Sequence, residues 1–473
     1  MVGILSVGLH IPMYRLRRDV IADAWRVRSL GGERVVAGYD EDSLTMAVNA
    51  AFDCMKGRGE QVNGLFFSST SSPYKEKQVS ATIATALDLP SRSYTSDILG
   101  SRRGATIALN LAAGMVKSGS AKSIMITASD CRLGTPRSDL EQRFGDAAAA
   151  LLIGDSNPIA VIVDSTSIFD EFSDEWRLEG DQFVRSWEER FTIAQGYMRV
   201  TKQSISEFLK AHALTSKDFS KVVLCGPDPR SQAILAKSLG FDVNTQLQPL
   251  LFDTVGDSGT GASLLMLAAV LERAKAGDRI LLVNYGDGND ILIFEVTEHI
   301  ESLRTREGME SRLARKIYIN YENYLCWRDL LPVEFPRRPE SQMPSVSSRW
   351  RERKRIFPLY AVRCRKCRMV QYPPQRVCIN CGSKDDFDDY KLSDKRANIF
   401  TLATDRLTTT KAPVAVNALL EFEGGGRMIC EVTDCDSTQL RIGTSVEMTF
   451  RKLRQFPGMV DYFWKARPIE TQE

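Results

Sequence analysis

Apolar segments of two lengths alternate over roughly the first 300 residues of the chain. Short apolar runs at residues 4–9 and 62–68 have the length and composition of strands, and the run at 43–55 carries the spacing of a helix. The run after Gly104 is apolar on every side and almost free of charge, which is typical of a helix buried in a core. We expect a further helix over residues 182–211. Strands that alternate with apolar helices predict an α/β fold in which helices cover the sheets.

The pattern occurs twice. A shift of 156 residues carries Ser101 onto Asp257 and the Leu-Ala-Ala of residues 111–113 onto the Leu-Ala-Ala of 267–269. Each copy runs through a glycine-containing turn, an apolar helix, a loop, an apolar strand and a polar turn, so the chain contains an internal repeat. Two such halves packed together would bring both helix starts and both strand ends to the middle of the molecule, where we expect one central site.

Ser101 stands between Gly100 and Gly104 at the start of the first apolar helix. A tight turn that leads into a buried helix points backbone N–H groups at whatever lies in front of it, and this favours an oxyanion or an enolate. Serine is also a common helix cap, so a purely structural role for Ser101 stays open.

The pattern changes after about residue 300. Residues 301–315 have the pattern of a charged helix, and the basic run at 345–355 has the composition of a solvated linker, with contact to phosphates or to a partner subunit as the alternative. Farther on, apolar and polar positions alternate at strand spacing, with glycine-containing turns between the runs. These runs predict a small β-barrel; they lie at residues 414–422, 427–432 and 446–450.

Four cysteines form a CxxC-x10-CxxC pattern. They are Cys364, Cys367, Cys378 and Cys381. Two such knuckles supply four thiolates, the ligand set of a closed, tetrahedral structural zinc site. The other six cysteines show no disulfide spacing, so we expect a reducing compartment.

Composition restricts the function classes. The chain has 473 residues, 43% of them hydrophobic, and a net charge of +2, which gives no electrostatic case for nucleic acid or membrane partners. We see neither a signal peptide nor a run of about 18 apolar residues, and we expect a cytoplasmic protein. Only three histidines occur (His10, His212 and His299), which limits the choice of general bases.

Several motifs in order resemble 3-hydroxy-3-methylglutaryl-CoA synthases, particularly the archaeal type. They are Pro-Met-Tyr-Arg-Leu at 12–16, Asp-Glu-Asp-Ser-Leu-Thr-Met-Ala-Val at 40–48, Phe-Gly-Asp-Ala-Ala-Ala-Ala-Leu-Leu at 144–152 and Val-Gly-Asp-Ser-Gly at 255–259. The resemblance covers roughly residues 1–330. It implies a duplicated thiolase fold with αβαβα layers, a CoA thioester as substrate, and a homodimer formed through that fold.

The catalytic positions of this family differ here. Matching the motifs puts Ser101 at the position of the family's nucleophilic cysteine, Thr70 at that of its glutamate and Cys225 at that of its histidine. A serine nucleophile needs a nearby base because its hydroxyl is far less acidic than a thiol. The resemblance therefore does not transfer the acyl-enzyme Claisen condensation to this chain.

An aldol or retro-aldol step needs only a stabilised thioester enolate, so it is the reaction that we favour. The expected catalytic residues are Ser101, Tyr74, Thr70, Cys225, Asp257 and Asn284, and those expected to hold the CoA ester are Arg102, Gly259, Gly261 and Gly286. Tyr74, Asp97, Asp257 and Asp287 are candidate acids or bases, and a cap or turn role is an alternative for each carboxylate. Two other functions stay open: a non-catalytic acyl-CoA-binding scaffold subunit, and an acyltransferase that uses Cys225.

The C-terminal part resembles the DUF35 family, which combines a rubredoxin-like zinc ribbon with a small OB-fold barrel. The resemblance rests on the cysteine knuckles, the barrel pattern and the Tyr-Phe-Trp-Lys-Ala-Arg-Pro of residues 462–468. It implies contact with a thiolase or synthase subunit, here fused to the module or separate. We expect five segments: two thiolase-fold halves, a linker, a ribbon and a barrel, at 1–160, 161–300, 301–355, 356–393 and 394–473.

Overall fold

A computed structural model describes residues 1–334, 345–408, 410–412, 414–456 and 458–469. Part of the expected linker, residues 335–344, lies outside the described residues. The chain divides into two compact units. Unit 1 comprises residues 1–37, 42–84 and 89–324, and unit 2 comprises residues 38–41, 85–88 and 325–473.

Unit 1 is built on a nine-stranded sheet with the order β11-β12-β13-β8-β1-β7-β6-β4-β5. Its strands are β1 (Gly3–His10), β4 (Gly64–Ser69), β5 (Tyr94–Leu99), β6 (Ser123–Asp130), β7 (Ala147–Gly154), β8 (Ala160–Phe169), β11 (Lys221–Leu224), β12 (Arg279–Tyr285) and β13 (Gly288–Val296). The two halves meet where β1 pairs with β8 at Gly3 and Ile4. On either side of that junction the same antiparallel and parallel pairings recur, so the sheet is duplicated as the repeat predicts.

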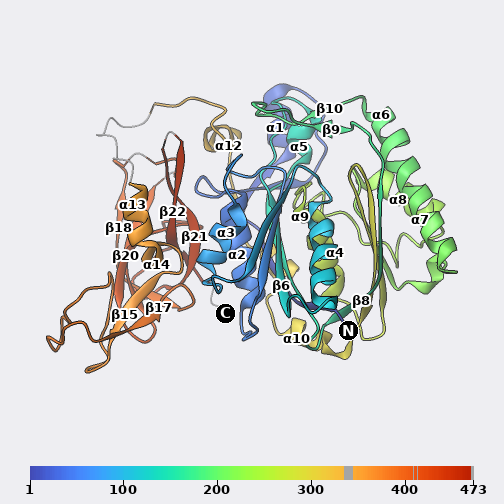
Figure 1. Ribbon diagram of the computed structural model, residues 1–473. Helices are drawn as coiled ribbons and strands as arrows, with labels where there is room; N and C mark the ends of the chain where they lie inside the picture. Colours follow the sequence, from blue (N-terminus) through green and yellow to red (C-terminus); the bar gives the residue numbers. More distant parts are fainter. Residues whose placement is uncertain (335–344, 409, 413, 457, 470–473) are drawn as a thin grey trace. The chain divides into compact units, whose positions relative to one another are not determined.

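The helices repeat with the same spacing. They are α2 (Ser43–Met55), α3 (Val79–Ala86) and α4 (Gly104–Lys117) in the first half and α7 (Arg199–Ala211), α8 (Pro229–Ser238) and α9 (Gly261–Leu271) in the second. The starts of α2 and α7, like those of β6 and β12, are 156 residues apart. Figure 1 shows α4 and α9 between the strands of the two halves and α7 and α8 on the outer side of the second half. The predicted α/β thiolase-like architecture is confirmed.

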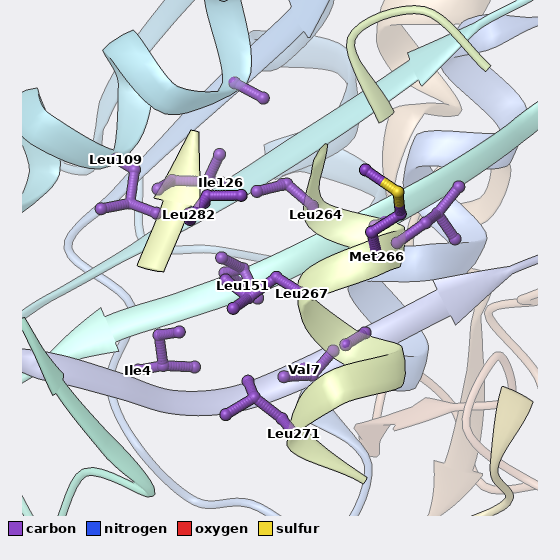
Figure 2. Close-up of a cluster of buried hydrophobic side chains, with 14 of the residues drawn as sticks. Ile4, Val7, Leu109, Ile126, Leu151, Leu264, Met266, Leu267, Leu271 and Leu282 are labelled. Carbon is purple, nitrogen blue, oxygen red and sulfur yellow. The ribbon is translucent and has the colours of Figure 1, made fainter. Parts of the chain in front are cut away.

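The core of unit 1 takes side chains from both halves. Figure 2 shows Leu109 of α4 and Leu264, Leu267 and Leu271 of α9 among residues of β1, β6, β7 and β12. These four leucines are fully buried. Burying a leucine side chain stabilises a fold by about 2 kcal/mol, so these two apolar helices fix the centre of the unit and hold their N-terminal turns in place.

The remaining elements of unit 1 are short. They are β2 (Tyr14–Arg17), α1 (Arg18–Trp25), β3 (Glu33–Val36), α5 (Asp139–Arg143), β9 (Glu175–Trp176), β10 (Arg185–Ser186), α6 (Glu189–Phe191), the π-helix η1 (Thr192–Met198), the 3-10 helices η2 (Ser216–Asp218) and η3 (Glu298–Ile300), α10 (Glu301–Arg304), α11 (Met309–Ala314), β14 (Ile317–Tyr318) and α12 (Tyr321–Trp327), which extends into unit 2.

Two helix predictions were wrong in extent. The helix expected over 182–211 is replaced, before α7, by β10, α6 and the π-helix η1. Gly196 lies within η1, and a Cβ there would come within 2.5 Å of the Tyr285 hydroxyl, so tertiary packing sets this turn. The helix expected over 301–315 is two helices separated at Gly308, a residue that disfavours helix interiors.

Unit 2 contains a ribbon and a barrel, as predicted. The ribbon sheet consists of β15 (Tyr360–Cys364), β16 (Val370–Gln371) and β17 (Phe387–Lys391), and the closed barrel of β18 (Ala397–Asp405), β19 (Ala415–Phe422), β20 (Arg427–Val432), β21 (Ser445–Phe456) and β22 (Met459–Pro468). The basic run forms α13 (Val346–Arg351) and α14 (Arg353–Ile356). In the described part of the chain, no helix is both long and apolar enough to cross a membrane.

Candidate functional site

A cavity lies in unit 1 where the starts of α4 and α9 meet the carboxyl ends of β11 and β12. Its empty volume is about 510 Å³, counted together with open solvent. Five of the residues singled out in the sequence line it, namely Arg102, Cys225, Asp257, Gly259 and Asn284. The duplicated fold thus gathers at one place residues that are up to 182 positions apart (Arg102 to Asn284).

Four charged side chains form a network at the cavity. Asp257 Oδ2 accepts hydrogen bonds from Arg102 Nη2 at 2.8 Å and from Arg132 Nη1 at 3.2 Å. Glu175 Oε2 lies 3.5 Å from Arg102 Nη1 and also accepts a hydrogen bond from Arg132. Arg132 stacks on the Phe144 ring, its guanidinium carbon 4.1 Å from the ring centroid. The network holds two cations and two anions and is therefore neutral overall.

The network fixes the protonation states of Asp257 and Arg102. Burial by itself would raise the pKa of the Asp257 carboxyl, but the charges of Arg102 and Arg132 outweigh it, so the pKa lies below its usual range. Burial acts in the opposite direction on Arg102, and Asp257 and Glu175 outweigh it, so the pKa of the guanidinium is raised. Near neutral pH the cavity therefore presents a carboxylate and a guanidinium.

Cys225 lies in the wall of the cavity as a thiol. Burial raises its pKa to about 12, although the charge of Arg102 acts to lower it. Because the thiolate is the nucleophilic form of cysteine, Cys225 is poorly suited to nucleophilic attack near neutral pH.

Asn284 and Gly259 hold the two helix starts in position. The Asn284 side-chain amide donates hydrogen bonds to Thr106 Oγ1 at 3.1 Å and to the Arg102 carbonyl at 3.4 Å. Gly259 has φ +61°, and a Cβ there would lie 2.2 Å from Asp130 Oδ2, so glycine is required. Gly261 begins α9, and Gly286, with φ +159°, follows β12.

Ser101 lies just before α4 and is not among the residues that line the cavity. Its hydroxyl accepts a hydrogen bond from the Arg103 backbone N–H at 3.3 Å, which is a cap-like contact. The neighbouring residue Arg102 is the one that reaches the cavity, where its side chain contacts Asp257.

Tyr74, Thr70 and Asp97 also lie outside the cavity lining. The Thr70 hydroxyl and backbone N–H both donate to Asp130 Oδ1. Asp97 accepts hydrogen bonds from the Val79 and Ser80 N–H groups at the start of α3, the capping role that was the alternative for it. Burial raises the pKa of Asp287, which is likewise not part of the lining.

Three acidic or basic residues of this region were not singled out in the sequence. Asp130, at the end of β6, accepts hydrogen bonds from the hydroxyls of Ser69 and Ser71 and from Thr260, and so ties the two halves together. Arg132 follows two residues later, and Glu175 comes from β9. A polar turn after an apolar strand was the available signal for Asp130, whereas no local pattern marked Arg132 or Glu175.

The four cysteines of the ribbon converge in unit 2. Their sulfur atoms all lie within 4.8 Å of one another, with Cys364 and Cys381 3.7 Å apart and Cys367 and Cys378 3.5 Å apart. Tetrahedral zinc with Zn–S bonds of about 2.3 Å requires sulfur atoms roughly 3.8 Å apart. The donor set and its spacing therefore fit structural zinc.

Sequence comparison identifies archaeal relatives of the first two thirds of the chain. A hydroxymethylglutaryl-CoA synthase of Thermococcus gammatolerans is 32% identical over 332 residues, which cover 68% of this chain and 95% of that protein. The hydroxymethylglutaryl-CoA synthase of Archaeoglobus fulgidus is 30% identical over 340 residues, which cover 69% and 98%.

Three family models match separate parts of the chain. The 3-oxoacyl-[acyl-carrier-protein] synthase III model matches residues 97–170, the ChsH2 rubredoxin-like zinc ribbon model residues 355–387, and the ChsH2 C-terminal OB-fold model residues 391–451. A crystal structure of an HMG-CoA synthase complexed with CoA superposes with a TM-score of 0.62 at 20% identity and covers 68% of this chain and 89% of that one. The 3-oxoacyl-[acyl-carrier-protein] synthase III of Aquifex aeolicus gives 0.56 at 18% identity and covers 62% and 100%.

Proposed function

Because the chain belongs to the hydroxymethylglutaryl-CoA synthase family, with ChsH2-type zinc ribbon and OB-fold domains at its C-terminus, we propose that unit 1 makes or breaks a carbon–carbon bond of an acyl-CoA thioester by aldol chemistry. The reaction passes through a thioester enolate and forms no acyl-enzyme. The observation that carries the proposal is the side chain of Arg102, held in the cavity by Asp257 beside a thiol that stays protonated.

An acyl-enzyme would need an activated nucleophile at the cavity. Ser101 does not line the cavity, and the pKa of the Cys225 thiol is about 12. Arg102 instead supplies a permanent positive charge with several N–H donors. Such donors, positioned beforehand in a site shielded from water, stabilise the negative charge that develops on an enolate oxygen.

In the retro-aldol direction, the Asp257 carboxylate accepts the proton of the substrate's 3-hydroxyl group. The electrons of that O–H bond form the carbonyl at C3 while the C2–C3 bond breaks and its electrons pass to the thioester enolate, whose oxygen lies against Arg102. The enolate then takes a proton at C2 from the Asp257 carboxylic acid, giving a shorter acyl-CoA and an aldehyde or ketone. Asn284 acts as a positioning residue because its side-chain amide donates a hydrogen bond to the Arg102 carbonyl.

Mass spectrometry tests this proposal. The full-length protein is incubated with a panel of 3-hydroxyacyl-CoA esters, and both the thioester products and the intact protein mass are recorded. We expect cleavage products without an adduct. Asp257→Asn should lower kcat by roughly 100- to 10,000-fold, the range for loss of a general base.

Asp170→Asn is the matched control, because Asp170 also pairs with an arginine, Arg199 at 3.0 Å, but outside the cavity lining. Its kcat should equal that of the unmodified protein. An acyl adduct on Cys225, or full activity of Asp257→Asn, would overturn the mechanism.

A non-catalytic acyl-CoA-binding subunit is the second candidate. The observation that favours it is the neutral network, in which Asp257 and Glu175 already engage both arginines. CoA esters that bind without product formation, alone or together with a separate thiolase or synthase, would support this function over the first.

Assembly is part of the proposal. Strand β5 is the last strand of its sheet, and Tyr94 and Leu99 on it are 54% and 42% exposed. Since an exposed sheet edge is a template for pairing, a homodimer formed through β5 follows. Light scattering should give twice the chain mass, and Tyr94→Lys should shift the protein toward the monomer. An unmodified protein that stays monomeric at micromolar concentration would exclude this dimer.

A further inference from the structure

The cavity lining contains two chemically different groups of residues. Arg102, Asp257 and Asn284, from the helix starts and β12, are polar. The apolar side of the lining comes from the loop before Gly256 and from α9; it consists of Leu250, Leu251, Phe252, Ala262 and Met266. In the proposed reaction the thioester and the 3-oxygen of a substrate contact Arg102 and Asp257, which leaves the apolar side to contact whatever extends from the reacting carbon atoms.

The apolar side is held in a fixed shape. The buried Arg18 guanidinium donates a hydrogen bond to the Phe252 carbonyl and lies 4.1 Å from the centroid of its ring. The Leu251 carbonyl accepts hydrogen bonds from the N–H groups of Val255 at 2.8 Å and Gly256 at 3.0 Å. Since a side chain and two backbone groups fix this loop, its apolar surface is part of the folded structure, ready to receive an apolar group without rearranging.

The charges of the cavity leave no cation for an additional anion. Among the described residues that line the cavity, Arg102 is the only cationic side chain; it already pairs with Asp257 and Glu175, and the proposed reaction places the enolate oxygen against it, so no second lining cation is left for a carboxylate. A carboxylate on the acyl group would enter a cavity whose lining already carries the negative charge of Asp257. Burying an unpaired charge is strongly unfavourable, so such an acyl group should be rejected.

We propose that the acyl group of the substrate is neutral and apolar, with its substituent seated against Leu250, Phe252 and Met266. This inference rests on the proposed function and narrows it. It separates this chain from an enzyme whose acyl group ends in a carboxylate, because the apolar side offers hydrophobic contact and no counter-charge.

A pair of esters that differ at one group tests the inference. 3-Hydroxy-3-methylpentanoyl-CoA carries a methyl group where 3-hydroxy-3-methylglutaryl-CoA carries a carboxylate, and the CoA part is shared. We expect kcat/KM and affinity to favour the neutral ester by at least about 100-fold. Equal kcat/KM and affinity for the two esters, or a preference for the carboxylated ester, would overturn the inference. Turnover of either ester would still support the proposed aldol function.

A charge added to the apolar side should reverse the preference. Leu250 is half-buried, so a lysine there can be accommodated, and its ammonium would face the acyl group. Leu250→Lys should shift the ratio of the two affinities toward the carboxylated ester by at least about tenfold, whereas the control Leu250→Met should not change it.

Calorimetric measurement of ester binding distinguishes failure of the proposed aldol function from failure of the inference about the acyl group. Neutral-ester selectivity in binding without turnover would refute the aldol mechanism and support the inference. Binding of neither ester, or an unchanged ratio in a folded Leu250→Lys protein, would refute the inference.

Discussion

Arg451 of the barrel offers the sharpest test of what stabilises unit 2. Its side chain is fully buried and forms ion pairs with Glu41 and Asp434, and its Nη1 lies 3.7 Å from Asp40 Oδ1. Lys465, also buried, lies 2.9 Å from Asp40 Oδ2. Residues 38–41 belong to unit 2, so its buried ion pairs include two acidic residues from the N-terminal part of the chain.

Replacing Arg451 by Met removes the guanidinium and leaves the carboxylates of Asp40, Glu41 and Asp434 buried without it. Removing one partner of a buried ion pair costs about 3–5 kcal/mol. For a unit of this size, 1 kcal/mol corresponds to about 2–4 °C, so the melting temperature of unit 2 should fall by roughly 6–20 °C. The buried carboxylates, rather than lost packing, are the source of this cost, since methionine keeps most of the apolar stem.

Differential scanning calorimetry of the full chain measures the effect. The control is Arg427→Met, because Arg427 pairs with Glu421 on the surface, with both side chains about half exposed, at 48% and 52%. Surface pairs contribute about 0–1 kcal/mol, so this variant should melt within a few degrees of the unmodified protein. If Arg451→Met and Arg427→Met shift the melting temperature equally, the reasoning about buried charge is refuted.

Three further outcomes are expected. Burial raises the pKa of Asp434 to about 6, above its value in the unfolded chain, so the folded state binds more protons between about pH 4 and 6 and the unfolding free energy falls as the pH rises through that range. Denaturant titrations at several pH values should show that this fall is shallower in Asp434→Asn. An equally steep fall in the variant would contradict the assignment to Asp434. A Cβ at Gly226 would lie 2.6 Å from the Tyr197 hydroxyl oxygen, so Gly226→Ala should lose about 1–3 kcal/mol of unfolding free energy in urea. By contrast, Tyr197→Phe removes a buried hydroxyl with no hydrogen-bond partner among the described residues and should leave the unfolding free energy unchanged or raise it. Equal losses of unfolding free energy in Gly226→Ala and Tyr197→Phe would contradict this argument. Elemental analysis should find one zinc per chain, and Cys378→Ser should lose it together with the ribbon's protease resistance; full metal content in that variant would exclude the four-cysteine site.

Sequence pattern alone determined the architecture. The repeat at 156 residues and the apolar runs predicted the duplicated halves, because core helices and strands carry their burial as local periodicity. The four zinc ligands were also predictable, since each cysteine pair is held in one short loop and the spacing limits the geometry. The barrel strand at Arg427–Val432 was predicted to the residue because alternation marks a half-buried strand.

The tertiary structure decided which side chains meet in the cavity. Ser101 and Arg102 are adjacent in the turn before α4, and only the path of the backbone determines that Arg102 reaches the cavity. Arg132 and Glu175 join it from distant segments without a local motif, and Asp257 becomes a stable carboxylate only because both arginines lie beside it. Charge networks and cavities depend on distances between segments far apart in the chain, and periodicity does not encode those distances.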